Sequence, residues 1–268
     1  MHTAATILKD NWQWRKQIGH LAVYELVKKN RGAALSWLWL FAKPLVFLFV
    51  LWFALEIGLR AGSSVGDAPY FLWLACGVIP WFFMSDMLSA GSNILNKYTH
   101  LVNKLKFPVS GISTMHCISD LIVHLGLVVI LFAIYFFCGM PLDWYLLQVP
   151  IIIFVMFLFF NTFSILTSQI SAISKDFANL IKTLIRPIFW LSGIIFNVGA
   201  INIPWIQGIL MFNPVTFFVT SFRDALYYKI WIWEDPLSLG AFALVFLVTF
   251  ITMLIVYRRL YKVVPDAV

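Results

Sequence analysis

The sequence predicts an all-α integral membrane protein with six transmembrane helices, an amphipathic interfacial helix before the first, and re-entrant helices between the fifth and the sixth. The composition is the first reason, because 62% of the residues are hydrophobic and 12% are charged, whereas soluble domains contain about 45–50% and about 25%. The apolar residues also form long runs, without the alternating ten-residue segments of a membrane β-barrel. Lysine and arginine residues flank these runs, as in other membrane proteins.

Seven apolar runs are candidates for spans, because a helix needs about 20 mainly apolar residues to cross the hydrocarbon layer. The first run reaches that length if it extends back to Trp37. The sixth is short and is interrupted by Asn213 and Pro214, which indicates a re-entrant segment rather than a span. We therefore expect six spans and one re-entrant element. The seven runs are Pro44–Leu59, Tyr70–Leu88, Gly111–Cys138, Trp144–Ile170, Thr183–Ala200, Ile209–Phe222 and Pro236–Tyr257.

The basic residues predict the orientation of the chain in the membrane. All but three of the 19 lysine and arginine residues fall in the N-terminal segment, the second and fourth loops with the adjoining end of the fifth span, or the C-terminal tail. The three exceptions are Arg60, Arg223 and Lys229. Cytoplasmic loops are enriched in lysine and arginine. We therefore expect both termini in the cytoplasm, which requires an even number of spans.

The segment before the first span is expected to form a helix that lies in the membrane surface. Polar residues recur there at steps of three and four, which places them on one helical face. Glu25 and Lys29 are spaced to form an i,i+4 pair, and Pro44 favours a bend into the first span. The alternative is a basic anchor that only sets orientation. The polar face comprises Gln17, His20, Tyr24, Lys28 and Arg31, and the other side comprises Ala22, Val23, Leu26 and Val27.

The loop Asn93–Pro108 is polar and basic, yet it carries apolar residues at helical spacing. This pattern favours a short amphipathic helix that docks into a groove of a partner protein. The alternative is a helix that lies against the protein's own spans. The apolar residues are Leu95, Tyr98, Leu101, Val102 and Leu105.

Acidic residues inside apolar runs are candidates for function, because a charge within the membrane is costly. Glu56 and Asp86 lie near the ends of their spans, where they can reach the interface. Asp120 lies deeper, and His116 and His124 precede and follow it by four residues on the same helical face. The two histidines are about 12 Å apart along the axis, so the three residues cannot share one metal ion. A proton relay and polar packing between helices are both open interpretations.

Several motifs of catalysis and cofactor binding are missing. The sequence has no G-x-x-x-x-G-K-[ST], so it cannot bind ATP through a P-loop, and it has no H-E-x-x-H or G-x-G-x-x-G. Cys76, Cys117 and Cys138 form no C-x-x-C pair, which argues against a zinc site. We expect no metal or cofactor in this chain and no enzymatic activity of the chain alone. The net charge of +7 comes from residues that flank apolar runs, so nucleic acid is not an expected partner.

The chain resembles the membrane subunit of ABC-2 type exporters for lipid-linked polysaccharides, the family of O-antigen and teichoic acid exporters, and within it the wall teichoic acid exporters in particular. The resemblance covers nearly the whole chain and depends on several short motifs in the right order. The motifs are Tyr24–Arg31, Leu35–Trp39 followed by Pro44, Gly58–Arg60, Val65–Asp67, Gly77–Phe83, Gly91–Asn93, Lys106–Pro108, Asn213–Pro214 and Phe222–Arg223.

The resemblance implies one ABC-2 (type V exporter) transmembrane domain over residues 1–268. It implies a cytoplasmic N-terminus and interfacial helix at 1–43, a six-span core at 44–257 and a cytoplasmic tail at 258–268. The core would include a coupling loop at 93–108 and a gate region at 201–235. The implied assembly is a homodimer with two copies of a separate ATPase, which bind ATP and Mg²⁺. It would lie in the plasma membrane of a bacterium and export a polymer on undecaprenyl diphosphate, with wall teichoic acid expected.

Three groups of residues are expected to perform this export. Basic residues near the inner interface would attract the lipid diphosphate, and these are Lys28, Lys29, Arg31 and Lys43. The coupling loop would contact the ATPase through Tyr98, Leu101, Val102, Leu105, Lys106, Phe107 and Pro108. The outer gate would contain Asn213, Pro214, Phe217, Phe218 and Arg223.

Other classes of function remain as alternatives. A proton-coupled secondary transporter would use Asp120, His116 and His124 and would need no ATPase. A membrane enzyme acting on lipid-linked sugars would need convergent acids or a metal cluster in one cleft, whereas the sequence has isolated carboxylates. An exporter of drugs or small lipids within the same broad transporter class is a further alternative.

Overall fold

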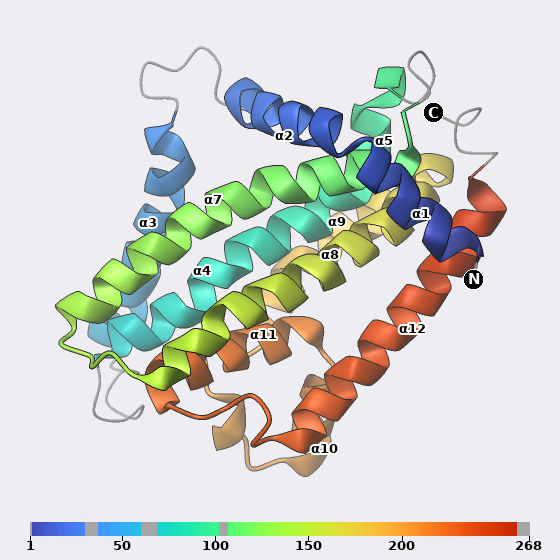
Figure 1. Ribbon diagram of the computed structural model, residues 1–268. Coiled ribbons are helices and arrows are strands. Elements are labelled where there is room, and N and C mark those ends of the chain that lie inside the picture. The colour runs from blue at the N-terminus through green and yellow to red at the C-terminus, as the bar shows by residue number, and fades with distance from the viewer. Residues whose placement is uncertain (1, 30–36, 60–68, 102–106, 262–268) are drawn as a thin grey trace.

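The computed structural model describes residues 2–29, 37–59, 69–101 and 107–261, and within these ranges every regular element is helical. Long helices lie side by side in one oblique bundle (Figure 1). Five helical segments have the length and hydropathy of a membrane span. They are Leu38–Gly58, Tyr70–Lys97, Val109–Phe137, Trp144–Ile173 and Pro236–Leu260. The all-α membrane fold expected from composition and apolar runs is thereby confirmed.

Three of the first four segments combine a regular helix with a shorter element, and the third segment is one regular helix. In the first, α3 (Leu38–Trp52) continues as the π-helix η1 (Phe53–Gly58). In the second, α4 (Tyr70–Ser89) is followed by the 3₁₀ turn η3 (Gly91–Asn93) and α5 (Ile94–Lys97). The third is α7 (Val109–Phe137), and the fourth joins η4 (Trp144–Leu147) to α8 (Gln148–Ile173).

The fifth span differs from its expected limits. Its helix, α9 (Lys175–Leu191), begins eight residues before Thr183 and ends nine before Ala200. The residue before it, Ser174, is its N-cap, because the Ser174 hydroxyl accepts a hydrogen bond from the backbone N–H of Phe177. It ends just before Gly193, which has a φ of +71°, a conformation that glycine adopts without steric cost. At 17 residues α9 is about 25 Å long.

The gate region contains a sharply bent pair of helices. The helices α10 (Pro204–Met211) and α11 (Pro214–Arg223), the second continued by η6 (Asp224–Tyr228), meet at an angle of 94°. Asn213 caps α11 by accepting the Val215 N–H, and Pro214 occupies the first turn, where its missing donor costs nothing. The predicted break at Asn213-Pro214 is confirmed. The last helix, α12 (Pro236–Leu260), follows.

The helix α4 forms the centre of the bundle. It contacts α3, α7, α8, α9 and α11, and fifteen of its 20 residues are buried. A helix that is apolar on all sides is expected to be surrounded by other helices. By contrast, α3 has buried side chains on only a small part of its surface, so most of it is available to lipid or to another protein.

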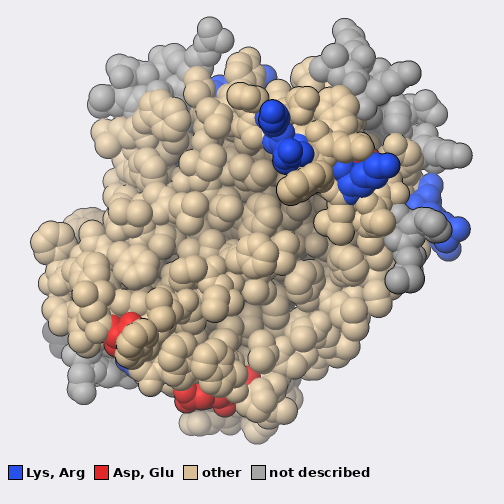
Figure 2. Space-filling view, in the orientation of Figure 1, with Lys and Arg blue, Asp and Glu red and all other residues tan. Residues whose placement is uncertain are grey.

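One end of the bundle carries most of the positive charge. The helices α1 (His2–Gln13) and α2 (Arg15–Lys29) lie across this end, where the last turns of α12 also lie (Figure 1). Figure 2 shows lysine and arginine side chains over this end and acidic side chains at the opposite end. Of the expected polar face of α2, Gln17, His20, Tyr24 and Lys28 are exposed, and Arg31 lies outside the described residues. Val23 and Val27, expected on the other side, are exposed as well.

Candidate functional site

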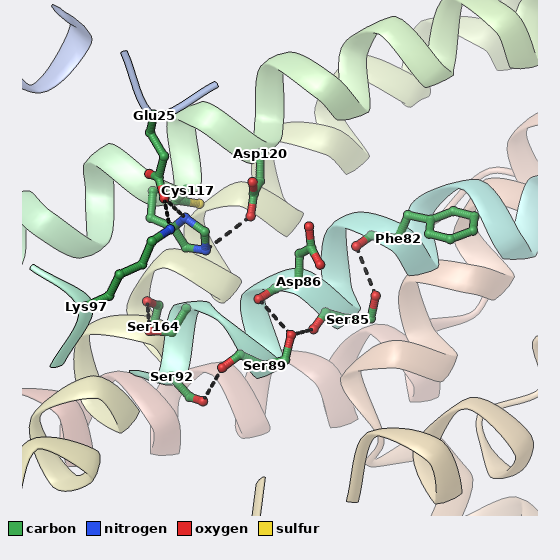
Figure 3. Close-up of polar contacts among 12 residues, drawn as sticks. Glu25, Phe82, Ser85, Asp86, Ser89, Ser92, Lys97, Cys117, Asp120 and Ser164 are labelled. Carbon is green, nitrogen blue, oxygen red and sulfur yellow. Dashed lines mark hydrogen bonds and ion pairs between the residues drawn. The ribbon is translucent and has the colours of Figure 1, made fainter. Parts of the chain in front are cut away.

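A chain of charged side chains connects three separate elements at the positively charged end. Glu25 of α2 accepts a hydrogen bond from Lys97 Nζ of α5 at 2.8 Å, and its Oε1 lies 3.2 Å from His116 Nδ1 of α7. On the other side of the ring, His116 Nε2 lies 3.2 Å from Asp120 Oδ2. Figure 3 shows Lys97 and Glu25 converging from different elements, with Asp120 further along. We call these four residues the Glu25 network.

Burial strengthens the electrostatic attraction between the members of this network, because the local dielectric constant is low. Glu25 is 1% exposed and His116 is fully buried. Burial raises the pKa of Glu25, but hydrogen bonds and charge from His116 and Lys97 outweigh it and lower the pKa from 4.5 to about 2. Each ring nitrogen of His116 lies 3.2 Å from a carboxylate oxygen, that of Glu25 on one side and that of Asp120 on the other.

Two expectations concern members of this network. Glu25, whose spacing allows a pair with Lys29, faces inward toward Lys97 and His116, and the side chain of Lys29 lies outside the described residues. The proposed triad of His116, Asp120 and His124 is joined only between its first two members. The His124 ring lies instead beside Phe83 and Phe222. In the described part of the chain, no group of three His, Cys, Asp or Glu residues is placed to hold a metal ion.

A cavity of about 380 Å³ opens next to the network, between α3, α4 and α7. Lys43 of α3, Asp86 of α4, and Asp120 and His124 of α7 contribute its polar lining. In Figure 3, Asp86 on α4 lies across from Asp120 on α7. The rest of the lining is apolar or aromatic and consists of Trp39, Leu40, Pro44, Phe82, Phe83, Val123 and Leu127.

The helix α9 presents a polar stripe that runs along much of its length. The stripe residues follow one another at steps of one and three, so they share one helical face. All are exposed in the single chain. Such groups in a membrane helix face a water-filled space or another protein rather than lipid. The stripe comprises Lys175, Asp176, Asn179, Lys182, Thr183 and Arg186.

The expected coupling residues face the protein's own interior where the structure describes them. Tyr98, Leu101 and Phe107 are 4–6% exposed and belong to an apolar cluster with α1, α2, α7 and α12. Pro108 is buried as well. This differs from the expectation that these side chains dock into a partner, because the apolar members of the pattern face inward. His100 and Lys97 are exposed. Val102, Leu105 and Lys106 lie outside the described residues.

The expected gate residue Arg223 holds three elements together. Its guanidinium donates to Gly193 O at 2.6 Å, to Ile194 O at 2.5 Å and to Trp73 O at 3.3 Å. It also lies 3.4 Å from the centre of the Trp73 ring, close enough for a cation–π interaction. The end of α9 is thereby fixed to α4 and α11.

The other gate residues are also held in place. Asn213 donates from Nδ2 to Ser192 Oγ at 2.8 Å. Phe217 and Phe218 are buried in the main core, where Phe217 stacks on Phe242 with ring centres 4.1 Å apart. Within the single chain these two rings therefore anchor α11 rather than line an opening.

The residues expected to attract a diphosphate lie at the positively charged end but are not all described. Lys28 is exposed on α2, and Lys43 is exposed on the first turns of α3. The side chain of Lys29 and all of Arg31 lie outside the described residues. The structure therefore places Lys28 at the surface and Lys43 beside the cavity.

Comparison with known proteins identifies the family. The model of the ABC-2 type transporter family matches residues 16–227, from the start of α2 to the end of η6. The chain belongs to this family. ABC-2 proteins are the membrane components of ABC transporters, which work with an ATP-binding subunit. The chain is also similar to the O-antigen export system permease protein RfbA of Myxococcus xanthus, with 20% identity over 225 residues, 82% of this chain and 84% of RfbA.

Sequence reasoning missed two parts of this ABC-2 site. It considered Glu25 only as an i,i+4 partner of Lys29, although a lone carboxylate between Ala22 and Leu26 on the inward side of α2 was a signal of burial. It placed Lys182 in the loop before a span beginning at Thr183, and Arg186 at the inner end of that span. Their spacing with Asn179 already indicated one helical face, which the structure extends back to Lys175.

Proposed function

We propose that this ABC-2 protein is the membrane subunit of an ATP-driven exporter for polysaccharides. The observation that carries the proposal is the similarity to an O-antigen export permease over 82% of the chain. The similarity covers most of this chain and most of RfbA. It therefore extends well beyond one isolated motif. A separate ATPase would supply ATP and Mg²⁺, in agreement with the missing P-loop.

The polymer would pass between two copies of the chain. The polar stripe on α9 supports this arrangement, because Lys182, Thr183 and Arg186 are unsuited to lipid and would line a water-filled route in a dimer. The exposed surface of α3 would provide further contact between copies. Aromatic side chains along such a route suit sugars, because each offers a flat and rigid apolar face.

The cargo would be a polymer carried on undecaprenyl diphosphate, with wall teichoic acid as the expected polymer. Lys28, Lys29 and Arg31 would attract the diphosphate at the inner interface of a bacterial plasma membrane, since cationic groups pair strongly with phosphate. The charge distribution in Figure 2 supports this orientation, with the positive end in the cytoplasm.

The Glu25 network would transmit the motion of the ATPase. It ties α5, which lies within the proposed coupling loop, to α2 and α7 through buried charges. A displacement of α5 that preserves these pairs must therefore move α2 or α7 with it. The bent pair α10 and α11, fixed by Arg223 and Asn213, would close the outer end against ions.

The test is extraction of the tagged protein in mild detergent, followed by mass spectrometry of the proteins that remain bound. We expect a P-loop ATPase at a one-to-one ratio. The double variant Lys182→Gln/Arg186→Gln should keep that partner but reduce export. Export equal to wild type would contradict the proposed route along α9. A preparation without any ATPase, with transport that follows a pH gradient, would support the proton-coupled alternative instead.

A further inference from the structure

A second cavity lies at the acidic end of the bundle, opposite α1 and α2 (Figure 1). Its volume is about 440 Å³, in the range of small-ligand sites. It is lined by α10, α11, η6, the short 3₁₀ turn η5 (Val198–Ala200) and the start of α12. These elements are distinct from α3 and α9, through which two copies of the chain would meet. The cavity therefore remains available for a ligand in the proposed dimer.

Thr216 contributes an unused hydroxyl group to this cavity. The residue is 6% exposed and lines the cavity, and its Oγ1 has no hydrogen-bond partner among the described residues. Thr249 and Thr252 donate to the carbonyl four residues earlier in α12. Thr216 is the third residue of α11, so no carbonyl of its own helix lies four residues before it. Buried polar groups without partners are rare and point to an unseen water or ligand.

Three further residues supply hydrogen-bond acceptors to the cavity lining. Asp224 of η6 is half-buried, and its carboxyl group accepts no hydrogen bond from the described residues. Asp235 caps α12 through Oδ1, which accepts the Ser238 N–H at 3.1 Å, so its Oδ2 is uncommitted. Gln207 of α10 donates from Nε2 to Ile201 O at 2.7 Å, which leaves its side-chain carbonyl oxygen. A ligand of this cavity must therefore offer several donors.

Tyr228 adds a donor without adding a charge. Its hydroxyl oxygen accepts from Trp73 Nε1 at 2.9 Å and from Asn197 Nδ2 at 3.4 Å. Both partners are donors, so the proton of Tyr228 remains free to be donated. Arg223, the basic residue among the described lining residues, directs its guanidinium to main-chain carbonyls and to the Trp73 ring. The ligand must therefore accept hydrogen bonds as well as donate them.

We infer that this cavity binds a neutral sugar unit through its hydroxyl groups. A hydroxyl group both donates and accepts, so neighbouring sugar hydroxyls can donate to Asp224 and Asp235 and accept from Thr216 and Tyr228. Apolar lining residues such as Met211 would pack against the C–H groups of the sugar ring. The inference rests on the proposed function, because the exported glycan would supply the sugar. It names the sugar units, rather than the phosphate groups, as the part of the polymer recognised at the outer end.

The chemistry of the lining distinguishes a sugar from other candidate ligands. A phosphate group would approach the negative charge of exposed Asp235, and like charges repel. An ammonium group has three donors but no acceptor, so it would leave the proton of Tyr228 without a partner. A divalent cation would do the same, and no group of three His, Cys, Asp or Glu side chains in the described ranges is placed to hold one. Hydroxyl groups satisfy both kinds of lining atom.

The test uses the full chain in a detergent without sugar head groups, and saturation-transfer NMR with soluble probes. The probes are the methyl glycosides of glucose, galactose, mannose and N-acetylglucosamine, with glycerol 3-phosphate and ethanolamine as anionic and cationic comparisons. We expect saturation transfer to at least one glycoside and to neither comparison. Thr216→Val should weaken the affinity for that glycoside about fivefold, the effect of losing one neutral hydrogen bond. Thr252→Val is the matched control on an exposed face of α12 and should leave the affinity unchanged.

Three results would overturn the inference. The first is an absence of saturation transfer to every methyl glycoside. The second is transfer to glycerol 3-phosphate or ethanolamine that equals or exceeds transfer to the glycosides. The third is wild-type affinity in Thr216→Val or, if that variant does not fold, in Asp224→Asn. The ATPase that co-purifies with the chain separates this inference from the proposed function, because a chain that keeps its ATPase but binds no glycoside overturns the sugar site alone.

Discussion

At the scale of single residues, the buried carboxylate of Glu25 links pH to stability. Its pKa is lowered from 4.5 to about 2 in the folded protein, because His116 and Lys97 outweigh the effect of burial. A carboxylate with a lowered pKa stabilises the fold at a pH above 4.5, and this contribution disappears as the pH falls from about 4.5 to about 2. The shift corresponds to roughly 3 kcal/mol at neutral pH.

We therefore expect Glu25→Gln to melt at a lower temperature than wild type at pH 7. The difference should shrink as the pH approaches 2, because the wild-type carboxylate then becomes neutral as well. Thermal unfolding in detergent across this pH range measures both effects. Glu234→Gln is the matched control, since Glu234 is exposed, and its melting temperature should follow wild type throughout. Coincident curves for wild type and Glu25→Gln would show that the network does not stabilise the fold.

Gly77 is a position where the added Cβ of an alanine would reduce the stability of the fold. A Cβ at this position would lie 2.7 Å from Arg223 Nη2 and 3.1 Å from Ile194 O, so Gly77→Ala must displace the guanidinium. A buried carbonyl that loses its donor costs about 1–3 kcal/mol. We expect a clear fall in melting temperature. Gly240→Ala in α12, where a Cβ meets nothing within 4 Å, should be neutral or slightly stabilising. Equal melting temperatures for the two variants would refute the tight fit at Gly77.

At the scale of elements, the segment after α5 separates residues that stabilise the chain from residues that can contact a partner. Leu101 is 5% exposed in the protein's own core, whereas His100 next to it is exposed. Leu101→Asp should therefore destabilise the isolated protein, because it buries an unpaired charge. His100→Glu should leave the free energy of unfolding within about 0.5 kcal/mol of wild type, as surface substitutions usually do, but weaken binding of the ATPase.

Co-purification of the ATPase and thermal unfolding distinguish these two outcomes. A His100→Glu protein that retains the ATPase at wild-type levels would remove His100 from the proposed contact. A Leu101→Asp protein with wild-type stability that no longer binds the ATPase would restore the original expectation that Leu101 itself docks.

The same elements explain how much of the fold could be predicted from sequence. The length of the apolar runs predicted the five span-length segments, including α12. The position of proline predicted the break at Asn213-Pro214. Both features depend on residues that are neighbours in the sequence. The limits of α9 could not be predicted in this way, because its polar stripe faces away from the described neighbours and made its first turns look like a loop. The inward turn of Glu25 was missed because its partners, Lys97 and His116, are 72 and 91 residues away.

At the scale of the whole molecule, the bent pair α10 and α11 determines the topology. The chain has five span-length segments and the shorter α9, so both termini lie on the same side if the bent pair turns back to the side it came from. If the pair crossed the membrane as one span, the termini would lie on opposite sides. The 94° bend and the position of α1 and the last turns of α12 at the same end of the bundle (Figure 1) favour the re-entrant arrangement.

Cysteine labelling in intact cells tests this arrangement directly. In a background without Cys76, Cys117 and Cys138, single cysteines would replace exposed residues Lys9, Trp233 and Tyr261. A membrane-impermeant maleimide should label only the Trp233 position, because Trp233 lies in the loop between η6 and α12 at the acidic end. The Lys9 and Tyr261 positions should react only after the membrane is permeabilised. Labelling of Tyr261 from outside with Lys9 protected would mean that α10 and α11 span the membrane, and the charge bias of the loops would then contradict the topology.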